Sequence, residues 1–156
     1  MKVRFLFAPI AIAALAQAAS AQVVINEVIE NPPGSGDEPW EYIELYGRPG
    51  MSLTGYAIAC VKGGNEFGAL AEVDEAFQLD GLTIGSNGLL VIYNNTAGSS
   101  FIPARCAPGT NVVTFTARHI PSTDTPGKLA NDDSSTYILV RKRPEHSISG
   151  SSSVYG

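Results

Sequence analysis

Carboxylates are the side chains of this sequence that could bind a metal ion or take part in catalysis, judged by residue type and spacing. Asp37, Glu38 and Glu41 gather where a loop leads into a strand-like run, and Asp132 and Asp133 stand in a turn before another. Carboxylate oxygens are ligands that calcium prefers, but neither group has the spacing of an EF-hand loop. We therefore expect solvated turns at both places, with calcium binding as the alternative.

The usual catalytic side chains form no recognisable constellation. His119 and His146 are the two histidines, and they lack the H-x-x-x-H spacing of a zinc site. No G-x-S-x-G sequence presents a nucleophilic serine, and the glycines at 63–68 lack the spacing of a phosphate-binding loop. The sequence thus predicts a protein that is not an enzyme and that holds no cofactor.

Trp40, the only tryptophan, stands where a loop becomes a strand. A large ring gains most free energy when it is buried, so we expect Trp40 to close one end of the core. The alternative is a platform on which a sugar stacks. Further along the chain, Asn94-Asn95-Thr96 matches the glycosylation sequon.

The N-terminus has the layout of a secretory signal peptide. Lys2 and Arg4 precede an uncharged apolar run at 5–16, and Ala19-Ser20-Ala21 supplies small residues for cleavage. We expect a signal peptide at 1–21, a product that starts at Gln22, and a location outside the cell or in the cell envelope. The alternative is an uncleaved anchor at the membrane surface; no transmembrane segment is expected after cleavage.

Length and charge suggest one acidic domain. The chain has 156 residues and a net charge of −5, and the loss of Lys2 and Arg4 with the signal would make it more negative. Nucleic acids are therefore not expected as partners, because their phosphates are bound by cationic surfaces. We expect a domain at 22–142, a polar tail or the start of a continuation at 143–156, and a partner that is an extracellular protein or a cell-surface component.

Cys60 and Cys106 are the two cysteines. An even count in an exported chain favours a disulfide, so we predict a bridge between them. Two separate thiols are the alternative, because Cys60 lies in an apolar run and Cys106 in a Pro-rich loop.

Short runs rich in Val, Ile, Leu and Tyr alternate with Gly, Pro, Asn and Ser, which predicts strands rather than helices. The predicted strands are 23–29, 41–46, 56–61, 89–93, 112–116 and 137–141. Ile43 and Leu45 share one face of the second run, whereas Leu89–Ile92 is apolar throughout, as in a central strand covered on both sides. The best helical candidate is 70–77. Short strands at this spacing indicate an all-β sandwich or barrel.

Five ordered motifs resemble the lamin-tail domain in its bacterial secreted form. They are Val24-Ile25-Asn26-Glu27-Val28, Glu41–Tyr46, Leu53-Thr54-Gly55-Tyr56, Ile84–Ile92 and Ser135–Val140. The resemblance covers about 23–142 and implies an immunoglobulin-like β-sandwich, with Asn26, Glu27, Glu44 and Gly55 as structural signature residues. The run Tyr46–Gly50 and the long segment 62–81 depart from the family pattern.

The signature residues have expected structural roles. Glu44 is expected to accept hydrogen bonds from backbone N–H groups and so tie two segments together, as Asn26 and Glu27 could also do. Gly55 permits a turn that a side chain would hinder. We therefore interpret the chain as a secreted, non-enzymatic structural or interaction module. The alternatives are an accessory domain of a secreted hydrolase or nuclease, and a calcium- or sugar-dependent adhesion module.

Overall fold

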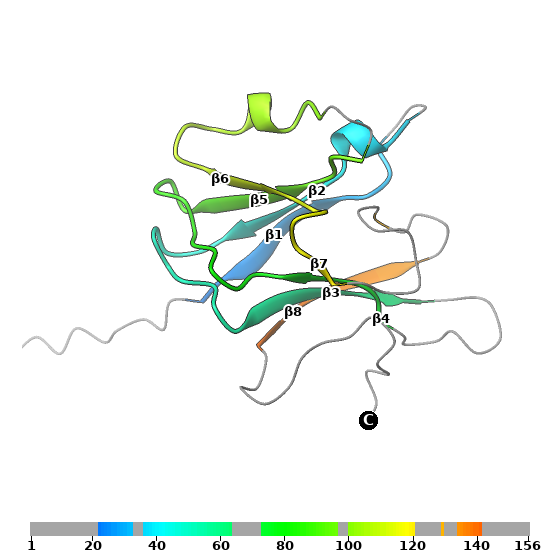
Figure 1. The fold of residues 1–156 in the computed structure, drawn as a ribbon, viewed down its shortest axis with the longest axis horizontal. Coiled ribbons are helices and arrows are strands. Elements are labelled where there is room, and N and C mark those ends of the chain that lie inside the picture. Colours follow the sequence, from blue (N-terminus) through cyan, green and yellow to red (C-terminus); the bar gives the residue numbers. More distant parts are fainter. Residues whose placement is uncertain are drawn as a thin grey trace, which may run out of the picture.

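The described residues form a sandwich of two four-stranded sheets (Figure 1). The computed structural model describes residues 22–32, 36–63, 73–96, 100–120, 129 and 134–141, so the predicted signal peptide and polar tail lie outside the described residues. The first sheet has the order β1-β2-β5-β6, formed by Val24–Ile29, Tyr42–Tyr46, Leu89–Tyr93 and Asn111–Thr114. The second has the order β7-β4-β3-β8, formed by His119–Ile120, Val73–Gln78, Tyr56–Lys62 and Ser135–Arg141. The predicted all-β sandwich is confirmed. No helix in the described ranges is long and apolar enough to cross a membrane.

Neighbouring strands are antiparallel with one exception, the parallel pair of β5 and β6. A parallel neighbour cannot be reached by a tight turn, so the chain must travel back along the sheet before β6 begins. It does so above the first sheet, where the short 3-10 helix η2 (Pro103–Arg105) lies (Figure 1). This return segment, described at 100–110, covers part of the outer face of the first sheet.

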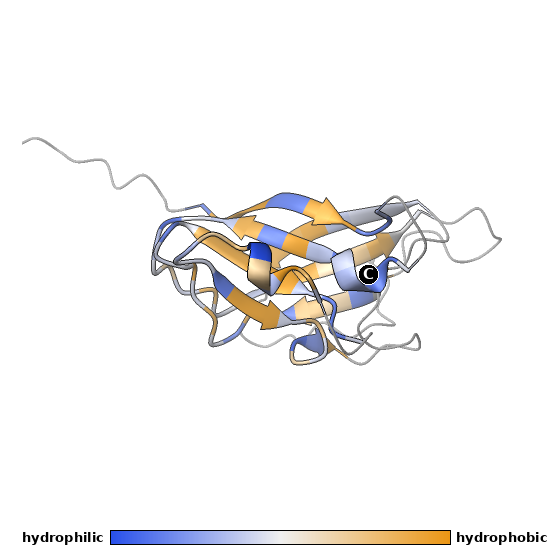
Figure 2. Cartoon of the chain, turned by 90° about the horizontal axis from the view of Figure 1, so that it is seen from above, coloured by the Kyte–Doolittle hydropathy of each residue, from blue (hydrophilic) through white to orange (hydrophobic). Residues whose placement is uncertain are grey.

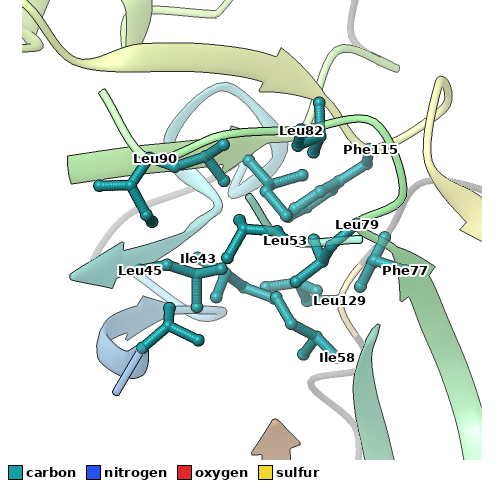
Figure 3. Close-up of a cluster of buried hydrophobic side chains, with 13 residues drawn as sticks. Ile43, Leu45, Leu53, Ile58, Phe77, Leu79, Leu82, Leu90, Phe115 and Leu129 are labelled. Carbon is teal, nitrogen blue, oxygen red and sulfur yellow. The ribbon is translucent and has the colours of Figure 1, made fainter. Parts of the chain in front are cut away.

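The core forms between the sheets because apolar and polar residues alternate along the strands (Figure 2). Ile43, Leu45, Leu90 and Ile92 of the first sheet are fully buried. They pack with buried residues of the second sheet and of the connecting loops, among which are Leu53, Ile58, Phe77, Leu79, Leu82, Phe115 and Leu129 (Figure 3). The outward-facing Val91 is also buried, as expected for a central strand covered on both sides.

The helix expected at 70–77 is wrong, because Val73–Gln78 forms β4. Val73, Ala76 and Phe77 have a spacing that suits one face of a helix, yet β4 pairs on one side with β3 and on the other with β7. A bulge at Cys60/Val61 adjusts the register between β3 and β4. Hydrogen bonding across the sheet therefore outweighs local helical spacing, and the short β7 is a further strand that the sequence did not predict.

Gly55 lies in a turn that requires a positive φ, as expected from the sequence. Gly55 has a φ of +87°, a region in which residues with a Cβ are strained. Its N–H donates to Asp80 Oδ1 at 2.7 Å, which ties the start of β3 to the turn after β4.

Candidate functional site

A hollow of about 430 Å³ lies on the outer face of the first sheet. Tyr42 and Glu44 alternate with the core residues Ile43 and Leu45, so their side chains point away from the core and form part of the hollow. The other lining residues come from the end of the short helix η1 (Glu38–Trp40), from β5 and from the return segment: Trp40, Leu89, Val91, Ile102, Arg105, Cys106, Ala107 and Thr110.

The return segment lies over the first sheet (Figure 2) and contacts η1. The N–H of Phe101 donates to the Pro39 carbonyl at 3.2 Å, and the Ser100 hydroxyl donates to the same oxygen at 3.1 Å. The rings of Trp40 and Phe101 pack with their centres 4.7 Å apart, and the Arg105 guanidinium lies 4.9 Å from the centre of the Trp40 ring. These contacts anchor one wall of the hollow on η1.

The expectation that Trp40 closes the core is wrong. Its side chain is only partly buried, and it lines the outer hollow, separated from the core by the first sheet. The ring still gains from packing, but its partners are Phe101 and Arg105 rather than core side chains.

Two carboxylates stand beside each other at one side of the hollow. Glu27 of β1 lies opposite Glu44 of β2, at a register shift between Ile25 and Glu27 that leaves Asn26 as the extra residue. Asn26 Nδ2 donates to Glu44 Oε1 at 2.7 Å. The Tyr42 hydroxyl is hydrogen-bonded to Glu27; burial raises the pKa of Tyr42, and the hydrogen bond and the charges of both glutamates raise it further.

The role expected of Glu44 belongs to a different residue. Glu44 is half-buried and its partner is the Asn26 side chain, not a backbone N–H. Glu41 is buried, only 2% exposed, and it accepts from Asn94 Nδ2 at 2.6 Å and from the Leu129 N–H at 3.3 Å. Glu41 therefore ties the start of β2 both to the end of β5 and to Leu129.

The sequon asparagine is part of this buried network. Asn94 is 1% exposed, and its Oδ1 accepts from the N–H of Thr96 at 2.8 Å and from the Thr96 hydroxyl at 2.7 Å. A glycan could not be attached to Asn94 in the folded protein, because the amide nitrogen that would carry it donates to Glu41 inside the sandwich.

The predicted disulfide is absent from the structure. Cys60 and Cys106 remain thiols, and the first sheet lies between them. Cys60 alternates with Ala59 in β3 and shares the inner face with Ile58, where it neighbours Tyr137 of β8. Cys106 lines the outer hollow, and its Sγ donates to the Ile102 carbonyl at 3.3 Å.

A second interior contact joins the sheets near Cys60. The Tyr137 hydroxyl donates to Glu30 Oε2 at 2.7 Å. Burial is the main cause that raises the pKa of Tyr137, followed by the neighbouring Cys60 and Glu30. The phenol therefore stays protonated and serves as a hydrogen-bond donor across the sandwich.

The predicted metal candidates do not come together as a site. Asp37 and Glu38 are half-buried, whereas Glu41 turns into the sandwich; Asp132 and Asp133 lie outside the described residues. In the described part of the chain, no group of three or more acidic, His or Cys side chains could hold a metal ion. His119 packs edge-on to Phe77, and burial lowers its pKa, which favours the neutral imidazole.

The half-buried Cys106 offers a chemical probe of the hollow. Burial raises the pKa of this thiol and the charge of Glu44 raises it further, so less thiolate is present at a given pH than for an ordinary cysteine. We expect the alkylation rate of Cys106 with iodoacetamide, followed by peptide mass mapping, to keep rising with pH beyond the point where glutathione has levelled off. Glu44→Gln should shift this profile to lower pH. A profile like that of glutathione, or one unchanged in Glu44→Gln, would show that Cys106 does not face Glu44.

The sequence did not point to Phe101, Arg105 or Thr110 as residues of this region. The only available signal was a segment at 100–110 with aromatic and basic residues between two predicted strands. No family model, curated protein or solved structure matches this chain.

Proposed function

We propose that the chain is a lamin-tail-like, immunoglobulin-like β-sandwich that acts outside the cytoplasm as a non-enzymatic interaction module. The signal-peptide layout of 1–21 supports export, and the five ordered motifs support the family. The two-sheet architecture agrees with the fold that the resemblance implies. In this proposal the partner is an extracellular protein or a cell-surface component, bound through the outer face of the first sheet.

The observation that carries the proposal is the hollow above β2 and β5. Its volume of about 430 Å³ falls within the range of ligand-binding clefts. Its residues come from a sheet and from a segment held down by ring packing and hydrogen bonds. A surface held in one shape before binding loses little entropy when a partner docks.

A photo-crosslinking residue at the rim tests this function. Phe101 is 49% exposed beside the hollow, so Phe101→p-azidophenylalanine in the full chain, expressed in its own cells, should yield a covalent adduct with one partner. The matched control is Thr136→p-azidophenylalanine, at an exposed position of β8 in the other sheet. The intact mass of the exported product, measured by mass spectrometry, should correspond to a chain that starts at Gln22.

Adducts that form equally from both positions, or from neither, would contradict an interaction surface at the hollow. A product that keeps Met1 would contradict the proposed export.

A further inference from the structure

The pairing of Glu27 with Glu44 is unfavourable in the protein alone. Like charges directly opposite each other on neighbouring strands repel and destabilise the pair. The two residues are register partners in β1 and β2, and both contribute to the raised pKa of the Tyr42 hydroxyl between them. In the described part of the chain, the contacts shown for these carboxylates are hydrogen bonds from neutral groups, the Tyr42 hydroxyl to Glu27 and Asn26 Nδ2 to Glu44. Two neighbouring carboxylates whose described contacts are hydrogen bonds from neutral groups suit an external cation.

The rest of the hollow fits the stem of a long side chain. Leu89, Val91 and Ile102 form apolar walls, and the Trp40 and Tyr42 rings stand beside them. Arginine and lysine place an aliphatic stem against apolar surface and extend a charged head toward polar groups. Aromatic faces attract such a head, and carboxylates pair with it.

We propose, on the basis of the proposed function, that the hollow receives an arginine or lysine side chain from a basic segment of a protein partner. The aliphatic stem lies along Leu89 and Val91, and the cationic head reaches the side where Glu44 stands, with Glu27 next to it. The net negative charge of the chain draws such a segment toward the protein from a distance.

Arg105 is the internal competitor of this ligand. Its guanidinium already lies over the Trp40 ring at 4.9 Å, and its positive charge repels a second cation in the same hollow. Arg105 therefore limits the affinity, and its removal should strengthen binding. This effect is opposite in sign to the loss of either glutamate, so a general loss of structure cannot imitate the full pattern.

The experiment titrates the whole mature protein with acetyl-Gly-Arg-Gly-amide and acetyl-Gly-Lys-Gly-amide. The readout is the NMR shift of the indole N–H of Trp40, a single resonance because Trp40 is the only tryptophan. The matched neutral probe carries norleucine in the central position. We expect the cationic peptides to bind at least about threefold more tightly than the neutral one, and raised salt to reduce this difference.

Three variants and one control assign the effect to the hollow. Glu27→Gln and Glu44→Gln should each weaken binding of the arginine peptide by about threefold, and Arg105→Gln should strengthen it by about threefold. Glutamine keeps an acceptor oxygen for Tyr42 or Asn26, so the fold is preserved. Thr136→Lys makes the same change in net charge as Glu44→Gln, but on the other sheet, and should leave the affinity within about 1.5-fold.

Three results would overturn the inference: equal affinity for the neutral probe, glutamate variants that behave like Thr136→Lys, or no binding of any peptide. Each leaves the proposed function to be judged by the Phe101 adduct. An adduct without peptide selectivity would mean that the hollow binds a partner by other chemistry. If p-azidophenylalanine at position 101 formed no adduct, the result would contradict the proposed function.

Discussion

Phe115→Ala is expected to lower the free energy of unfolding by about 4 kcal/mol. Phe115 is fully buried, and its ring packs on that of Phe77 with the centres 4.8 Å apart. Truncation removes the transfer free energy of the ring, leaves a cavity between the two sheets and ends this aromatic contact. Urea denaturation of wild type and variant, followed by circular dichroism, gives the difference.

Phe101→Ala is the matched control for this measurement. It removes the same atoms from the chain that leads into β6, but Phe101 is 49% exposed and contacts Trp40 on the outer face. We expect it to cost less than about 1.5 kcal/mol, the loss of part of one aromatic contact. Similar losses from both variants would mean that Phe115 does not occupy the core shown in Figure 3.

Glu41→Leu is expected to cost about 3 kcal/mol, although leucine is apolar and Glu41 is buried. The substitution removes the acceptor of both Asn94 Nδ2 and the Leu129 N–H. Two donors then remain buried without that acceptor, and each unsatisfied donor costs about 1–3 kcal/mol. Thermal and urea denaturation measure the loss.

Glu44→Leu provides the comparison. Its partner Asn26 is exposed, so water can replace the lost hydrogen bond, and the change should cost less than about 1 kcal/mol. A double variant, Glu41→Leu with Asn94→Leu, should recover part of the stability lost in Glu41→Leu because one stranded donor is removed. If Glu41→Leu were as stable as Glu44→Leu, the buried network at this end of the sandwich would be disproved.

Strand positions could be predicted because short runs rich in Val, Ile, Leu and Tyr stand between turn-forming residues. In Tyr42–Tyr46 every second residue is apolar, and those residues are the ones that face the core. Two errors share one physical cause. The apolar spacing in Val73–Gln78 reflects only a local preference for helix, whereas the pairing of this segment with β3 depends on residues distant in the sequence. In the same way, the residue type does not tell Glu41 from Glu44, because which of them is buried depends on distant residues that pack against it.

The hollow could not be predicted because it depends on topology. Its cover exists because β6 lies parallel to β5 and the chain must return across the sheet, and nothing in the composition of either strand states this direction. The same fact explains the error for Trp40 and Cys106. Both residues line the hollow on the outer face of the first sheet. Trp40 is therefore not part of the core, and Cys106 is not bonded to Cys60.

Blocking Cys106 tests directly whether the hollow is the binding surface. Cys106 lines the hollow while Cys60 is buried inside the sandwich, so N-ethylmaleimide applied to the folded protein should attach at Cys106 and occupy part of the hollow. The control is Cys106→Ser treated in the same way, and the measured quantity is the yield of the adduct from p-azidophenylalanine at position 101. We predict that the reagent abolishes the adduct in the protein with Cys106 and leaves it intact in Cys106→Ser. An undiminished adduct from the blocked protein would contradict binding through this face.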